Sequence, residues 1–191
     1  MTVADIHRIH LGVAETGKLL ALKGRHRDAL TRYREALRLA FGARAPQLFA
    51  RHYLHCVLES LEHLGEHARA AELAGTAAEQ AANPDPSPFQ RRDRACLLER
   101  QGVNRAKAGD VPGARVALAA ALALDAALPL SRTLLDWTSR GLAITPARLA
   151  DAQRRHRYWV VCPETVDAAR AMEHPLAAAA AGMTTETAHG R

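Results

Sequence analysis

Aromatic residues are scarce in this 191-residue sequence, where phenylalanine, tyrosine and tryptophan together make up 4%. A core with so few rings has to be filled by aliphatic and small side chains, and alanine is abundant here. This composition favours closely packed helices with small residues at their contacts. Glycine and proline number only 21 together, too few for a low-complexity chain, so we expect a folded domain with a substantial core.

The sequence also lacks the features of an exported or membrane protein. Its three cysteines, Cys56, Cys96 and Cys162, have no paired spacing, which favours reduced thiols over disulfides. The first ten residues lack the basic-then-apolar order of a signal peptide. No apolar run is long enough to span a bilayer. We therefore expect a soluble, cytoplasmic protein that does not contact a membrane.

Lysine is nearly absent, because Lys18, Lys23 and Lys107 are the only three and arginine supplies the other 23 basic residues. The formal net charge of +6 would indicate nucleic-acid binding only if the basic residues gathered on one face. The densest basic run, Arg154 to Trp159, mixes charge with two aromatic rings. We expect this run to close the end of the fold, and a regulatory contact with nucleic acid through Arg154 to Arg157 is an alternative.

Recognisable catalytic motifs are missing as well. The sequence contains neither a G-x-x-x-x-G-K-[ST] phosphate-binding loop nor a G-x-S-x-G nucleophile elbow. Residues His63 to His67 match the H-x-x-E-H pattern of inverted zinc proteases, which needs both histidines on one unbroken helical turn. Gly65 is expected to end the helix between them, so the histidines should diverge. We expect a protein that is not an enzyme and carries no cofactor.

What the sequence does contain is a sparse internal repeat. Gly24, Gly65 and Gly109 each separate two amphipathic stretches, at spacings of 41 and 44 residues, which suits helix-pair repeats. After each glycine an alanine follows at five residues, then a small, aliphatic or aromatic apolar residue four further on, then another alanine after three. These positions are Ala29, Tyr33 and Ala36; Ala70, Ala74 and Ala77; Ala114, Leu118 and Ala121.

Apolar periodicity and turn residues predict the helices of three such pairs and of a C-terminal region. The pairs span about 3–42, 47–83 and 87–128, within a repeat array of 1–128. Residues 129–175 are expected to form capping helices, and 176–191 a disordered tail. The individual helices are predicted at 3–22, 28–41, 47–64, 68–82, 88–108, 112–128, 131–140, from Pro146 to about Trp159, and from Pro163 to before Pro175.

The repeat resembles the tetratricopeptide repeat (TPR) family, in a variant with a period longer than the usual 34 or so residues. The family pattern W-x2-L-G-x2-Y…A-x3-F…P is similar to Val13-x2-Thr16-Gly17-x2-Leu20…Ala29-x3-Tyr33 and to Leu98-x2-Gln101-Gly102-x2-Arg105…Ala114-x3-Leu118, which Pro129 closes. The second copy has Leu54, Val57, Leu58, Leu61, Ala70 and Ala74, with Leu58 in the place of a glycine. The resemblance covers residues 10–129 and implies a right-handed superhelix.

That resemblance also implies a concave groove, lined by the first helix of each pair, that binds a protein or peptide partner. The family's carboxylate clamp uses lysine, arginine and asparagine, of which only Lys18 and Arg100 are matched. A non-enzymatic adaptor is therefore the leading hypothesis, with a homo-oligomer left open. The implied groove residues are Leu11, Ala14, Glu15, Lys18 and Leu22; His52, His55, Cys56, Glu59, Glu62 and His63; Cys96, Glu99, Arg100, Val103 and Lys107.

The second of these sets allows a different function. His52 and Cys56 are one helical turn apart, as are Glu59 and His63, so their side chains share a face within reach of one ion. Imidazole and thiolate ligands suit zinc or a similar metal. A metal- or cofactor-handling accessory protein that uses His52, Cys56 and His63 is therefore an alternative to the adaptor. The simpler interpretation of the same face is a polar groove whose histidines stack on a peptide.

The last prediction concerns the end of the array. The helix at 112–128 is rich in alanine and leucine and would leave an apolar stripe in water. We expect residues 130–172 to pack over it as helices, with Trp137 and Trp159 as the main anchors.

Overall fold

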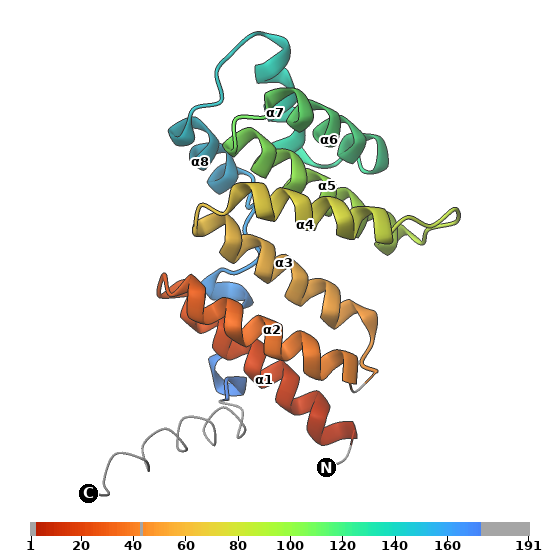
Figure 1. Cartoon of the computed structure of the whole chain (residues 1–191), viewed down its shortest axis with the longest axis vertical. Helices are drawn as coiled ribbons and strands as arrows, with labels where there is room; N and C mark the ends of the chain where they lie inside the picture. The colour runs from red at the N-terminus through yellow and green to blue at the C-terminus, as the bar shows by residue number, and fades with distance from the viewer. Residues whose placement is uncertain (1–2, 43, 173–191) are drawn as a thin grey trace, which may run out of the picture. The chain divides into compact units, whose positions relative to one another are not determined.

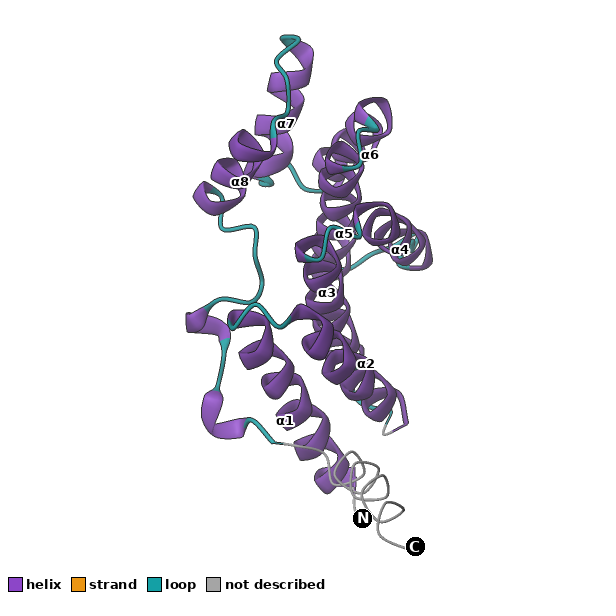
Figure 2. Cartoon of the chain, turned by 60° about the vertical axis from the view of Figure 1, so that its left-hand side comes forward, coloured by secondary structure: helices purple, strands orange, loops and turns teal. Residues whose placement is uncertain are grey.

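The computed structural model describes residues 3–42 and 44–172 (Figure 1). Within these residues the chain is helix and loop without a strand, so the all-α prediction is confirmed (Figure 2). None of the described helices is long and apolar enough to cross a membrane. The helices of this part are α1 (Val3–Leu22), α2 (His26–Gly42), α3 (Gln47–His63), α4 (His67–Gln80), α5 (Pro88–Lys107), α6 (Val111–Leu124), α7 (Pro129–Ser139) and α8 (Pro146–Arg155), followed by the 3-10 turns η1 (Pro163–Thr165) and η2 (Ala168–Arg170).

The turns within the three helix pairs have the same geometry. Gly24, Gly65 and Gly109 all adopt left-handed backbone conformations, with φ of 73°, 76° and 87°. Such values favour glycine because a Cβ atom would be strained there. In each turn the glycine N–H donates to the carbonyl three residues earlier, and the next N–H donates to the carbonyl five residues earlier. The repeat seen in the sequence is therefore also a repeat of local structure.

Paired helices approach closely where a glycine of the first faces a large side chain of the second. A Cβ atom on Gly17 would lie 2.6 Å from the Tyr33 ring, and one on Gly102 would lie 2.6 Å from Leu118 Cγ. Tyr33 and Leu118 are fully buried. The equivalent positions of the second pair are Leu58 and Ala74, also fully buried, with the large residue on the first helix instead of the second. Leu58 stands where the other two pairs have a glycine, and the equivalent position of the second helix holds the smaller residue Ala74.

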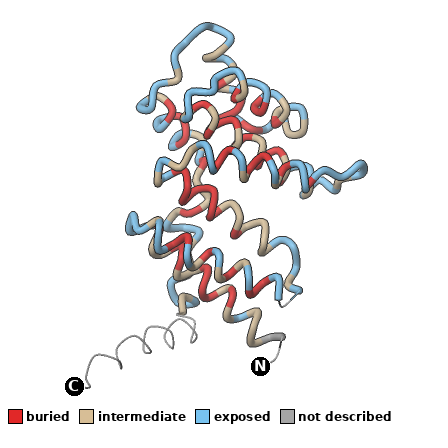
Figure 3. The backbone as a smooth tube through the Cα atoms, viewed as in Figure 1, coloured by how far each residue is buried: buried red, intermediate tan, exposed pale blue. Residues whose placement is uncertain are grey.

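The helices fall into two compact units, and the division lies inside α3. Unit 1 comprises residues Met1–Val57 and Val161–Arg191. In it α1 packs against α2, and η2 contacts α1. The core of this unit lies between α1, α2 and the first part of α3 (Figure 3). Its buried members are Val13, Ala14, Ala36, Leu39, Ala40 and Tyr53.

Unit 2 comprises residues Leu58–Val160 and contains α4 to α8. Here α7 and α8 share a hydrophobic core with α5 and α6. The anchors differ from the prediction, because Leu130, Leu134 and Leu149 are the fully buried residues. Trp137 and Trp159 lie only partly buried at the margin of this core.

Two predictions for the C-terminal residues are wrong. Helix α8 ends at Arg155 and does not reach Trp159, because Arg157 adopts a left-handed conformation with φ of 50°. The helix expected from Pro163 onward is replaced by η1 and η2, which are separated by extended backbone at Val166 and Asp167. Of the residues expected in the cap, 165–172 lie against α1 in unit 1. The predicted disordered tail, 176–191, lies outside the described residues.

Candidate functional site

The implied groove residues of the second and third helix pairs are mostly buried within unit 2. Glu59, Glu62, Glu99 and Arg100 are each 8% exposed or less. Chain segments that follow α6 cover them, because Gln153, Tyr158 and the Val160 N–H bond to these carboxylates. Val103 belongs to the hydrophobic core, and Cys96 is partly buried. Within unit 2, the implied groove positions are therefore covered by later residues of the same chain.

The Glu62 carboxylate is the centre of this network. It accepts hydrogen bonds from Lys107 Nζ at 2.7 Å, Gln153 Nε2 at 2.7 Å, Tyr158 OH at 2.9 Å and Asn104 Nδ2 at 3.1 Å. Burial alone would raise the pKa of Glu62, but the charges of Lys107 and Arg100 and the hydrogen bonds outweigh it and hold the pKa below its usual value. The carboxylate is therefore ionised at neutral pH and fixes α8 and the residues after it.

Two further buried carboxylates extend the network. Glu59 accepts from the Val160 N–H at 2.7 Å and lies 3.5 Å from Arg100 Nη2. Glu99 accepts from the N–H and the hydroxyl of Ser131 at the start of α7, at 3.0 and 2.8 Å. Burial raises the pKa of Glu99. These contacts join α3, α5 and α7 and show a structural role for the three glutamates.

The H-x-x-E-H motif is split as predicted. Helix α3 ends at His63 and α4 begins at His67, with left-handed Gly65 between them. The His63 ring stacks on Trp159 at 4.3 Å between ring centroids, whereas His67 Nδ1 lies 3.3 Å from Asn104 Oδ1. The two rings have different partners and do not converge on one position.

The first helix presents a different kind of surface. Residues 165–172 run along α1, which contacts their main chain at four points. Lys18 Nζ donates to the Thr165 carbonyl at 3.3 Å, and the Asp167 N–H donates to Glu15 Oε2 at 2.9 Å. The Met172 N–H donates to the Gly12 carbonyl at 3.1 Å, and Thr16 Oγ1 donates to the Met172 carbonyl at 2.8 Å. We call this surface, formed by Leu11, Gly12, Glu15, Thr16 and Lys18, the α1 face.

Gly12 allows the chain to come this close. A Cβ atom at this position would lie 2.3 Å from Met172 Cγ and 2.8 Å from the Arg170 carbonyl oxygen. Any other residue would push the segment away from the helix. Gly12 and Thr16 were not among the predicted site residues. A glycine inside a helix, outside the repeat positions, was the signal available in the sequence, since such a glycine costs helix stability and often marks a close approach.

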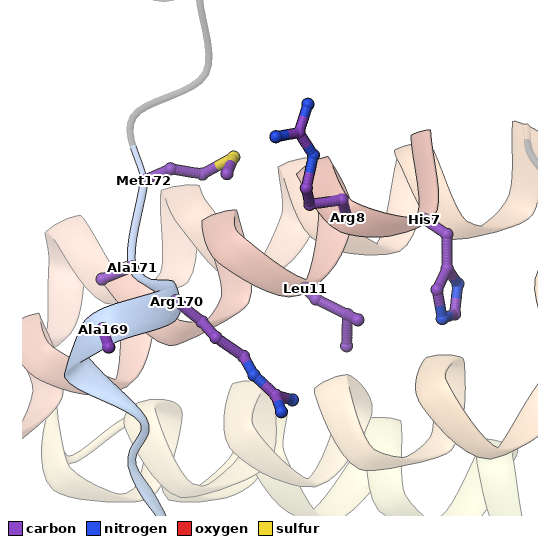
Figure 4. A pocket seen from close by; sticks show the side chains of 7 residues that line it. All are labelled: His7, Arg8, Leu11, Ala169, Arg170, Ala171 and Met172. Atoms are coloured by element: carbon purple, nitrogen blue, oxygen red, sulfur yellow. The ribbon is translucent and has the colours of Figure 1, made fainter. Parts of the chain in front are cut away.

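Two pockets open on the α1 face and share Leu11. The first, of about 560 Å³, lies between α1 and the C-terminal segment and is lined by His7, Arg8, Leu11 and 169–172 (Figure 4). The second, of about 340 Å³, lies between α1 and α3. It brings together five of the predicted groove residues with three apolar or aromatic neighbours. Its lining residues are Leu11, Ala14, Glu15, Lys18, Leu48, Phe49, His52 and Tyr53.

Two histidines, His52 in the lining of the second pocket and His10 bonded to Tyr53 of that lining, are kept uncharged by burial. His10 is fully buried, with Nδ1 at 2.8 Å from the Tyr53 hydroxyl and Nε2 at 3.0 Å from His7 Nδ1. Burial, helped by the charge of His7, lowers the pKa of His10 to about 4. Burial also lowers the pKa of His52 to about 4, with Lys18 and His55 acting in the same direction. Both imidazoles are neutral at pH 7, so the charged groups that line the second pocket are Glu15 and Lys18.

The candidate metal ligands are divided between the two units. His52 Nε2 lies 3.8 Å from the fully buried Cys56 Sγ in unit 1, while His63 belongs to unit 2. Among residues 3–42 and 44–172, no group of three or more histidine, cysteine, aspartate or glutamate side chains is arranged to hold a metal ion. His55, half-buried, and Leu22, exposed, line neither pocket.

The basic run at the end of α8 has an exposed part and a buried part. Arg154, Arg155 and Arg157 are exposed, and Arg154 forms an ion pair with Asp151. The Tyr158 ring, by contrast, is buried inside unit 2 under the Arg100 guanidinium, 4.8 Å from the ring centroid. Trp159 is held between His63 and Lys107.

Comparison with family models, with curated proteins and with solved structures found no match.

Proposed function

We propose that this protein is a non-enzymatic, TPR-like adaptor that binds an extended peptide or protein segment on the α1 face of unit 1. The observation that carries this proposal is the set of four main-chain contacts between α1 and residues 165–172. Hydrogen bonds to main-chain atoms are available to any extended segment, whatever its side chains. The same face is therefore suited to a segment of another protein.

The second pocket supplies the apolar contacts such a segment needs. Leu48, at its edge, is 52% exposed, and Phe49 and Leu11 are partly exposed beside it. Short apolar pockets next to a main-chain binding surface are the usual combination in peptide recognition, since the pockets select side chains. Glu15 and Lys18 form a 2.8 Å ion pair within this pocket and fix its polar end.

The proposal is tested by selecting displayed peptides against the immobilised full chain and titrating them by calorimetry. Leu11→Asp places a charge in the wall that both pockets share and should weaken binding at least tenfold. Val116→Asp, on a residue of α6 that is 70% exposed, is the matched control and should bind as the parent does. If no peptide is selected, or if Leu11→Asp binds normally, the α1 face is not the partner site.

A metal-handling function is the second candidate, because His52 and Cys56 lie within 3.8 Å of each other. Two ligands leave a zinc ion incompletely coordinated, so a partner or a chelating cargo would have to complete the site. Elemental analysis of the purified protein separates the candidates. Stoichiometric metal that is lost in His52→Ala would favour the accessory protein, and metal-free protein that binds peptide would favour the adaptor.

A further inference from the structure

We propose that residues 165–172 are a ligand in cis for the α1 face, and that the partner is an extended segment that replaces them and lays a linear apolar side chain over Gly12. This inference rests on the proposed function and names its partner and its regulation.

The segment is held to α1 by its main chain, while half of its side chains face solvent. Thr165, Ala168, Ala169 and Arg170 are exposed. The Asp167 carboxylate bonds within the segment, to the Ala169 N–H and to Arg170. All four contacts with α1 use main-chain atoms of the segment, so another extended chain can make the same four contacts.

Met172 lies closest to Gly12 and defines the partner's chemistry. Its Cγ would lie 2.3 Å from a Cβ atom on Gly12, so the methionine side chain lies flat on the helix where the helix has no side chain of its own. Arg8 and Leu11 lie beside it in the first pocket (Figure 4). A linear apolar chain fits this contact. A β-branched side chain is wider and stiffer next to the backbone than methionine, and an acidic residue would put a charge into the pocket that Leu11 lines.

The segment has little regular structure of its own. It contains only the short turns η1 and η2, whereas the preceding Gln153 and Tyr158 keep their own buried hydrogen bonds to Glu62 in unit 2. Because it is part of the same chain, it competes with any partner at an effective concentration in the millimolar range. A partner therefore binds the intact chain more weakly than it binds a chain whose segment has been detached.

The experiment detaches the segment without changing α1. Asp167→Pro and Met172→Pro together remove both N–H groups that donate to α1, while Ala168→Pro stiffens the same stretch at the first position of η2 and removes neither donor. The probe is a fluorescein-labelled peptide with the sequence of residues 163–174, titrated into each full-length variant and followed by fluorescence anisotropy. Circular dichroism confirms that each variant is folded.

We expect the labelled peptide to bind the double-proline variant at least tenfold more tightly than it binds the parent or Ala168→Pro. A peptide with valine or glutamate at the position of Met172 should bind at least fivefold more weakly than the probe. Adding Gly12→Leu to the double-proline variant should abolish binding. Equal binding to parent and double-proline variant, or no binding to the latter, overturns the inference.

The outcomes also separate this inference from the proposed function. If library-selected peptides bind in a Leu11-dependent way but ignore the double-proline change, the adaptor stands and the cis ligand does not. If the parent is a dimer by sedimentation and the double-proline variant is a monomer, the segment docks on a second copy, and the cis assignment is wrong.

Discussion

At the scale of single residues, the size of one side chain sets the distance between paired helices. Gly102 on α5 leaves room for Leu118 on α6, and the gap is too small for any added carbon because Leu118 Cγ would lie 2.6 Å from a Cβ atom. Overpacking of this kind strains rotamers and backbone. The positions of Gly17 and Gly102 were predicted from the repeat, because small residues at helix contacts leave a pattern in the sequence.

Gly102→Leu should therefore destabilise the protein by about 1–3 kcal/mol. Combining it with Leu118→Ala should restore part of that loss, because the double variant copies the Leu58 and Ala74 arrangement of the second pair. Urea denaturation of the two single variants and the double variant measures the coupling. Additive losses would show that the two positions do not face each other.

Stability should also depend on pH through the buried histidines. The pKa values of His10 and His52 are lowered to about 4, so between pH 6.5 and 4 the unfolded chain binds protons that the folded chain does not. Stability is then constant above about pH 6.5 and falls as the pH drops towards 4, by up to about 1.4 kcal/mol per pH unit for each histidine. Urea midpoints at pH 7.5, 5.5 and 4.5 measure this slope. His10→Gln combined with His52→Gln should flatten it, and an unchanged slope would assign the effect to other groups.

At the scale of elements, helices and their turns were predictable, whereas the C-terminal path was not. The bounds of α1 and α3 and the caps at Ser87 and Thr145 follow from local signals: apolar periodicity, a capping side chain and a proline in first position. The segment around Asp167 has no such signal. Its extended conformation is set by hydrogen bonds to Glu15 and Gly12, more than 150 residues away in sequence.

The sequence did not indicate that several of the expected groove residues are buried, for a related reason. The first-helix positions Glu59, Glu62 and Arg100 are charged, and charge favours solvent or a partner. They are buried because donors from later in the chain satisfy them, and which donors arrive depends on tertiary structure. The α1 residues that line the second pocket, by contrast, share one face of that helix, so Leu11, Ala14, Glu15 and Lys18 were predicted together.

From the hydrogen bonds to Glu62 we predict that this carboxylate holds α8 in place. Glu62→Gln puts an amide where four donors converge and leaves the half-buried Lys107 without its counter-charge. We expect a loss of about 3 kcal/mol, as for broken buried pairs. Glu66→Gln is the matched control, because its ion pair with Arg69 is exposed and should be worth about 1 kcal/mol or less. Equal losses in urea denaturation would show that the Glu62 network does not hold the fold together.

At the scale of the whole molecule, the residues after 128 close the hydrophobic core of unit 2. Leu130, Leu134 and Leu149 cover Val103 and Leu118, which would otherwise meet water. Exposed apolar surface of this extent drives self-association.

A chain truncated after Leu128 should therefore be insoluble or self-associating, whereas a chain ending at residue 177 keeps every described contact and should behave as the parent does. Sedimentation velocity and the soluble fraction after expression measure both. A soluble, monomeric and fully helical 1–128 fragment would mean that α7 and α8 are a separate binding element and not a cap.

The large and the small residue of a helix contact do not occupy the same positions in all three pairs. This limits which helices of the chain could be exchanged for one another. Tyr33 faces Gly17 and Leu118 faces Gly102, whereas the equivalent positions of the second pair hold Ala74 and Leu58. A chimera that joined α3 to α2 would bring the Tyr33 ring to a place that Leu58 already fills. The pairs are therefore not interchangeable modules, and each second helix is matched by volume to its own first helix.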